Sequence, residues 1–113
     1  MRPFELTVEE VRPGVVLASL SGELDVHTAY TVDAELRRIE HNRPERLIID
    51  LRGLTFMDST GLARMLAVHR RAQRMGRRVT FVRGTEPIQR VLQLTAMDER
   101  LEMVGEPPLN NLH

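Results

Sequence analysis

Hydrophobic and polar residues alternate at the start of the chain. Phe4, Leu6 and Val8 are separated by polar residues, and a period of two is typical of a strand with one buried face. The sequence RPG at 12–14 is a turn signal, and the apolar run at 15–20 predicts a second strand. We expect these two strands to pair as an antiparallel hairpin.

A different spacing begins near residue 29. Ala29, Val32, Leu36 and Ile39 recur every three or four residues, which predicts an amphipathic helix. The sequence NRP at 42–44 should end this helix, because the residue before a proline is disfavoured in helical geometry. Charged residues occupy the other face, which we expect to be in solvent: Asp33, Glu35, Arg37, Arg38 and Glu40.

The middle of the chain holds a continuous apolar run at 46–51, which is typical of a strand buried on both faces. We expect residues 52–58 to form a loop with apolar anchors. A helix should follow from about residue 59 to 75 and end at Gly76, a residue that often follows a helix. Its inward-facing residues are predicted to be Leu62, Met65, Leu66 and Ala72.

The last third of the chain predicts one more strand, helix and strand. A strand at 78–82 precedes a helix that opens with GTEP at 84–87, and a final strand is expected at 101–104. Strands joined by helices should be parallel through right-handed crossovers. The sequence therefore predicts one small α/β domain over residues 1–104, with a mixed sheet whose edge hairpin is antiparallel. The tail at 105–113 has no periodicity and should be frayed.

Composition excludes several kinds of chemistry. The chain has 113 residues, and its 16 basic residues, all arginines, balance 16 acidic ones. With no net charge, no global field favours nucleic acid or an anionic membrane as a partner. Lysine and cysteine are both absent, which excludes Schiff-base or P-loop lysines and thiolate chemistry. The four histidines lack ligand spacing, so we expect neither a metal site nor a cofactor.

The N-terminus carries charge where a signal peptide needs an apolar stretch, and no apolar run is long enough to span a membrane. We therefore expect a cytoplasmic protein. A stretch rich in arginine is interpreted as a solvated helix face, partly available to an acidic partner, because the aromatic residues that stack on nucleic-acid bases are few. It contains Arg64, Arg70, Arg71, Arg74, Arg77 and Arg78.

Two turns carry the candidate chemistry. The sequences SGELDVHT at 21–28 and FMDSTGL at 56–62 both join a strand to a helix, so they should share one edge of the sheet. In the second turn, Asp58 or Ser59 can cap the helix. Gly61 is unfavourable in a helix by about 0.5–1 kcal/mol relative to alanine, so we expect it to leave a bare surface where another protein approaches Ser59. Gly61→Ala should then be neutral or stabilising by roughly 0.4–1 kcal/mol.

From its position, Asp25 can cap a helix that begins near His27. An enzyme is disfavoured because Asp58 and Ser59 lack an identifiable histidine base, although sequence distance leaves His27 and His69 open. A receiver domain is also disfavoured, because the chain has no early acidic pair and no lysine.

Three segments, GELDVHTA, LIIDLRGLTFMDSTGL and VTFVRGTEPIQRVLQLT, resemble the STAS domain of bacterial anti-sigma factor antagonists. The resemblance covers residues 4 to 104. It implies that Ser59 is phosphorylated by a partner kinase, which is typically the anti-sigma factor itself, and that a phosphatase reverses the modification. The implied partner-binding residues are Asp25, Asp58, Ser59, Thr60 and Gly61; Thr60 stands where relatives often have serine.

The resemblance also implies a mechanism. In its unphosphorylated form the protein would bind the anti-sigma factor and free the sigma factor, without being an enzyme itself. The alternative is a STAS domain that senses a ligand or acts as a scaffold and is never phosphorylated. The sequence around Ser59 favours the first interpretation.

Overall fold

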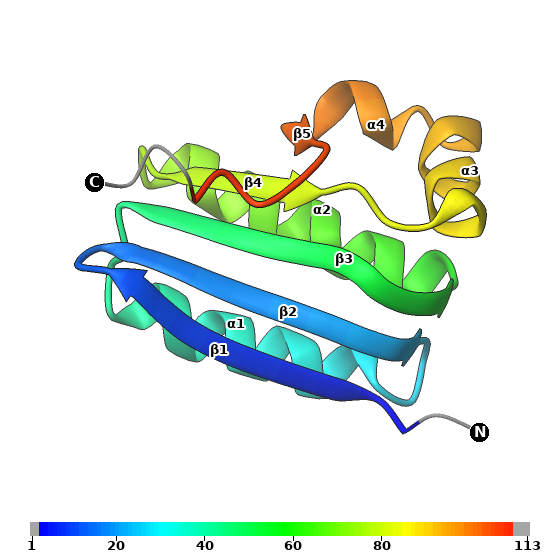
Figure 1. Ribbon diagram of the computed structural model, residues 1–113, viewed down its shortest axis with the longest axis horizontal. Coiled ribbons are helices and arrows are strands. Elements are labelled where there is room, and N and C mark those ends of the chain that lie inside the picture. The colour runs from blue at the N-terminus through cyan, green and yellow to red at the C-terminus, as the bar shows by residue number, and fades with distance from the viewer. Residues whose placement is uncertain (1–2, 110–113) are drawn as a thin grey trace.

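Five strands form one sheet whose spatial order follows the chain, β1-β2-β3-β4-β5 (Figure 1). The computed structural model describes residues 3–109. Strands β1 and β2 are antiparallel, whereas the other neighbouring pairs are parallel, so the predicted mixed sheet with an antiparallel edge hairpin is confirmed. The strands are β1 (Glu5–Arg12), β2 (Val15–Leu24), β3 (Arg46–Met57), β4 (Arg78–Val82) and β5 (Met103–Val104).

The two longest helices cover one face of the sheet and lie behind it in Figure 1. Apolar side chains from these helices and from the sheet form the main core, which the shorter helices complete through Ile88, Leu92 and Met97. A smaller cluster around Val15, Ile48 and Val82 lies on the opposite face. The helices are α1 (Ala29–His41), α2 (Ser59–Arg74), α3 (Glu86–Leu94) and α4 (Met97–Arg100).

Strands β2 and β3 are longer than the sequence predicts. The expected loop at 52–58 is wrong for most of its length, because β3 continues to Met57 and β2 continues beside it to Leu24. Their pairing resumes after register shifts, with Glu23 opposite Phe56 and Leu24 opposite Met57. The extra rungs satisfy backbone hydrogen bonds that a loop would leave to water. They also carry the two predicted turns to the same end of the sheet.

The C-terminal part differs from the prediction in detail. The helix predicted after β4 is confirmed as α3, and a short additional helix, α4, follows Ala96, whose φ of 58° lies in the left-handed region. The final strand contains only Met103 and Val104, and Leu101 is instead a buried residue after α4. Residues 105–109 carry no helix or strand, and the rest of the predicted frayed tail lies outside the described residues.

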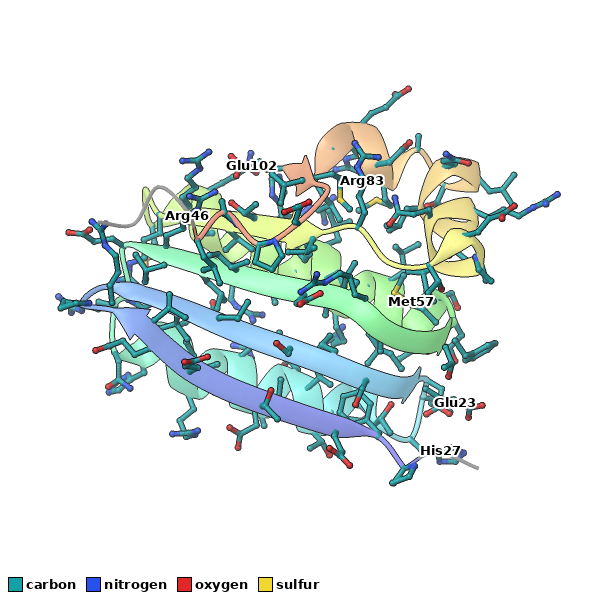
Figure 2. The ribbon with its side chains drawn as sticks, viewed as in Figure 1. Glu23, His27, Arg46, Met57, Arg83 and Glu102 are labelled. Carbon is teal, nitrogen blue, oxygen red and sulfur yellow. The ribbon has the colours of Figure 1, made fainter. Side chains whose placement is uncertain are left out.

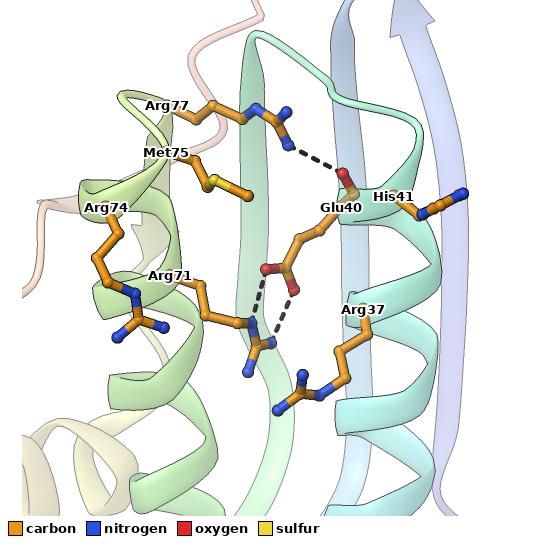
Figure 3. Close-up of a pocket in the computed structure, with 7 residues that line it drawn as sticks. All are labelled: Arg37, Glu40, His41, Arg71, Arg74, Met75 and Arg77. Carbon is orange, nitrogen blue, oxygen red and sulfur yellow. Dashed lines mark hydrogen bonds and ion pairs between the residues drawn. The ribbon is translucent and has the colours of Figure 1, made fainter.

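The prediction that Asp33 lies on a solvent-exposed face of α1 is wrong. Asp33 is only 9% exposed, and its carboxylate lies 2.9 Å from Arg37 Nε and 3.3 Å from Arg71 Nη1. Glu40 also pairs with Arg71, at 2.7 Å (Figure 3). The reason is that α2 packs beside α1, so the acidic edge of one helix faces the basic edge of the other. Arg71 is therefore an interhelical ion-pair residue and not a solvated one.

These ion pairs alter the ionisation of Asp33. Burial by itself raises its pKa, but the hydrogen bond from Arg37 and the charges of Arg37, Arg71 and Arg64 outweigh it, so the pKa lies below the usual range. The carboxylate is thus charged at neutral pH and links the two helices. Within residues 3–109, no helix combines the length and the apolar character needed to cross a membrane.

Candidate functional site

The two predicted turns meet at the carboxyl ends of β2 and β3. The backbone N–H of Asp58 donates to the carbonyl oxygen of Leu24 at 3.2 Å, which ties the end of β3 to the end of β2. Figure 2 shows Glu23, His27 and Met57 at this same end of the sheet. The expectation that the two turns share one edge is confirmed. We call the surface formed by residues 23–30 and 56–60 the rim.

Asp58 is the N-cap of α2, which decides between the two capping residues that the sequence allowed. Its Oδ1 accepts hydrogen bonds from the N–H groups of Thr60 at 2.9 Å and Gly61 at 3.0 Å. Its extended backbone, with φ of −101° and ψ of −174°, is typical of a cap. Because Asp58 satisfies these donors, Ser59 is not needed to begin the helix.

Ser59 is exposed at the first position of α2, whereas Thr60 is only half-exposed. Within residues 3–109, the Ser59 hydroxyl makes no hydrogen bond to a histidine or to any other group. The start of a helix favours negative charge, by typically 0.3–1 kcal/mol, through its backbone N–H groups and its dipole. A phosphate on Ser59 is therefore compatible with the local fold, and the hydroxyl is accessible to another protein.

The expectation that Gly61 leaves a bare surface is wrong. Gly61 is buried, and a Cβ placed on it would lie 2.7 Å from Leu24 Cγ and 2.9 Å from the Leu24 carbonyl oxygen. The missing side chain lets the first turn of α2 approach the end of β2. Gly61 therefore helps to position Ser59 by letting α2 pack closely on Leu24, and it does not itself present a surface to a partner.

Asp25 organises the turn before α1. Its Oδ1 accepts hydrogen bonds from the N–H groups of His27 at 2.9 Å and Thr28 at 3.2 Å. The helix itself starts at Ala29, two residues after the predicted start, so Asp25 stabilises the turn that leads into the helix. This supports the structural interpretation. Asp25 is also half-exposed on the rim, and its contact with a partner stays a prediction.

The same turn lowers the pKa of Asp25. Partial desolvation raises it, but hydrogen bonds from the backbone of His27 and Thr28 and from the Thr28 hydroxyl outweigh that effect. The Thr28 hydroxyl also donates to the Glu23 carbonyl oxygen at 2.8 Å, which joins the turn to the end of β2. The rim beside Ser59 is thus held by local hydrogen bonds and carries a charged carboxylate.

Sequence reasoning missed the apolar part of the rim. Tyr30 is 73% exposed, Val26 52% and Phe56 46%. Val26 lies in the turn after β2, Tyr30 in the first turn of α1 and Phe56 near the end of β3. Exposed aromatic side chains of this size are characteristic of protein interfaces. The available signal was an apolar residue beside the polar residues of each turn, Val26 and Phe56. The prediction of a loop at 52–58 missed this signal because it treated the apolar residues of that loop as anchors.

Comparison with known proteins is consistent with this geometry. A family model described as the STAS domain matches residues 7–108. An anti-sigma F factor antagonist of Paenibacillus polymyxa is 31% identical over 85 residues, which cover 74% of this chain and 73% of that protein. The anti-sigma-F factor antagonist RsfB of Mycobacterium tuberculosis is 28% identical over 93 residues, covering 80% of this chain and 73% of RsfB.

Solved structures show the same fold. An anti-sigma factor antagonist from Mycobacterium paratuberculosis superposes with a TM-score of 0.79 and 25% identity, covering 92% of this chain and 87% of that one. The anti-sigma factor antagonist SpoIIAA in its unphosphorylated form gives a TM-score of 0.76 at 22% identity, with 90% of each chain covered. These matches confirm the resemblance that the sequence predicted and the α/β architecture that it implied.

Proposed function

The chain belongs to the STAS domain family, and from this premise we propose that it is an anti-sigma factor antagonist that phosphorylation of Ser59 switches off. The observation that carries the proposal is the position of Ser59. It is exposed at the start of a 16-residue helix whose capping bonds are already made by Asp58. Because the Ser59 side chain makes none of these capping bonds, its modification would not remove a bond that holds the start of the helix.

The rim is the proposed docking surface for the anti-sigma factor. Tyr30, Val26 and Phe56 offer exposed apolar area, and Asp25 adds a charged group beside them. Large aromatic side chains at the centre of an interface commonly contribute most of its binding energy. In the unphosphorylated form, docking on this surface would free the sigma factor from the anti-sigma factor.

Phosphorylation would act through charge at the interface. A phosphoserine adds about −1.5 to −2 charges at neutral pH. Facing an acidic partner group at ~4 Å, each unit charge is unfavourable by on the order of 4 kcal/mol at a surface-like dielectric. A loss of about 3 kcal/mol already weakens binding more than a hundredfold. The fold of the antagonist need not change, because added bulk and charge are sufficient.

The proposed partners follow from this mechanism. The anti-sigma factor would itself be the serine kinase and would supply ATP and magnesium, and a phosphatase would restore the active form. The protein is then a binding protein in the cytoplasm and catalyses no reaction. A STAS domain that senses a ligand without being phosphorylated is the competing proposal.

Phosphorylation is tested by incubating the protein with its cognate kinase and ATP and mapping the modified residue by mass spectrometry. We expect phosphate on Ser59, none on Ser59→Ala, and normal modification of the matched hydroxyl variant Thr60→Val. Stoichiometric phosphate on Thr60, with Ser59 unmodified, would disprove the assignment.

Binding is tested by calorimetry with the purified anti-sigma factor. Ser59→Ala should bind as the wild type does, and Ser59→Asp should bind at least tenfold more weakly with an unchanged melting temperature. Equal affinity combined with a lower melting temperature would mean that Ser59 is only a structural residue. Normal binding of every variant, with no kinase activity on the protein, would favour the competing ligand-sensing proposal.

A further inference from the structure

We propose that a second surface, distant from Ser59, binds an acidic segment of a protein partner. This surface is a groove between the C-terminal halves of α1 and α2 (Figure 3). It consists of two adjoining hollows of about 260 and 290 Å³. We call it the basic groove, and the residues that define it are Arg37, Arg70, Arg71, Arg74, Met75 and Arg77.

The basic groove lies at the opposite end of α2 from the proposed switch. Ser59 is the first residue of the helix and Arg74 the last. At 1.5 Å of rise per residue, the two are separated by roughly 20 Å. A charge added at Ser59 is therefore between two and three Debye lengths away, since that length is about 8 Å at physiological salt, and it should not affect binding in the groove.

The internal ion pairs leave an excess of positive charge. Arg71 is paired with Glu40, at 2.7 Å, and Arg37 with Asp33, at 2.9 Å. Within residues 3–109, no carboxylate lies within 4.0 Å of Arg70 or Arg74. Arg77 donates to a backbone carbonyl, that of Glu40, at 2.9 Å. Three guanidinium groups thus keep an uncompensated charge along one side of the groove.

An apolar contact lies among these charges. Met75 is 67% exposed and lines the same hollow as Arg74 and Arg77. A methionine adapts its shape to different apolar partners, and arginine binds carboxylates through two parallel hydrogen bonds. The combination suits a peptide that alternates carboxylates with an aliphatic side chain.

The floor of the groove argues against phosphate as the ligand. The Glu40 carboxylate lies there, and both helices end at the groove, where the negative ends of the helix dipoles lie. A compact polyanion would be repelled by these groups. Carboxylates spaced along a peptide can instead reach the outer guanidinium groups separately.

The test is fluorescence anisotropy with a fluorescein-labelled peptide of repeated Glu-Glu-Leu, using a Gln-Gln-Leu peptide as the uncharged reference. We expect the acidic peptide to bind more tightly than the reference, and the double variant Arg70→Glu/Arg74→Glu to weaken binding at least about tenfold. The matched control Arg90→Glu/Arg100→Glu makes the same change in net charge on α3 and α4 and should stay within about twofold of wild type. Thermal melts of both double variants check that they fold.

Further measurements test whether the peptide binds in the basic groove. They separate this binding from binding at the rim, from general charge attraction and from phosphate binding. Met75→Ser should weaken binding of the acidic peptide about threefold, and Ser59→Asp should leave that binding unchanged. This pair of results distinguishes binding in the groove from binding at the rim. Equal losses in the two double variants, or no preference over Gln-Gln-Leu, would show that the attraction is only general charge and would refute the proposal. Displacement of the labelled peptide by short duplex DNA or inorganic phosphate would be compared with displacement by unlabelled acidic peptide. If DNA or phosphate displaced it at the lower concentration, and if this depended on the arginines, the ligand would be a phosphate and the proposal would be overturned.

Discussion

Gly61→Ala should destabilise the protein, although alanine is the better helix former. The added Cβ would lie 2.7 Å from Leu24 Cγ and 2.9 Å from the Leu24 carbonyl oxygen. Favourable carbon contacts begin near 3.5 Å, so the first turn of α2 or the end of β2 must move by several tenths of an ångström or more. Neither contacting atom is at the free end of a flexible side chain.

The magnitude follows from two opposing effects. Forcing an extra methyl group into a well-packed site is unfavourable by about 1–3 kcal/mol. Replacing glycine by alanine inside a helix recovers about 0.5–1 kcal/mol. We therefore expect the free energy of unfolding to fall by roughly 0.5–2 kcal/mol, or the melting temperature to fall by about 2–8 °C for a domain of this size.

The assay is urea unfolding followed by circular dichroism, with Gly105→Ala as the matched control. A Cβ at Gly105 meets no atom within 4 Å, so this variant should be as stable as the wild type. The close approach of α2 to Leu24 also predicts shifted amide NMR signals for Asp58 and Ser59 in Gly61→Ala only. A Gly61→Ala protein as stable as the wild type, or more so, would show that the added Cβ meets no clash and that Gly61 is an open surface.

The remaining predictions concern the cap, the helix interface and the rim. Asp58→Ala should lower the free energy of unfolding by about 1 kcal/mol in urea titrations, because the N–H groups of Thr60 and Gly61 lose their acceptor. Asp58→Asn should retain most of this capping stabilisation. Asp33→Asn should lower the free energy of unfolding at pH 7 by roughly 1–3 kcal/mol. Since the folded pKa of Asp33 is depressed, its contribution is complete above the unfolded value of about 3.9 and is lost as the pH falls through the lower folded value, so wild type and variant should converge in acid. Tyr30→Ala should weaken anti-sigma factor binding about tenfold in calorimetry without changing the melting temperature, because the ring is 73% exposed.

The elements and their order follow from local patterns in the sequence. Residues such as Val32 and Leu36 recur at helical spacing because a helix on a sheet buries one stripe, and both are fully buried as predicted. The uninterrupted run around Ile48 marked a strand covered on both sides. Gly76, with φ of 66°, follows α2 as expected. Each of these features depends on residues close together in the chain, and a local pattern is sufficient to predict it.

Which residues face one another across these elements depends instead on how the elements pack. Asp33 and Arg71 are 38 positions apart and form a pair that turns a predicted solvent face into an interface between helices. Leu24 is likewise distant in sequence from Gly61, yet the contact between them reverses the expected role of that glycine and sets the position of Ser59. Periodicity reports whether a side chain is buried, but the identity of its neighbour depends on how the elements pack, because a local pattern contains no information about the partner surface.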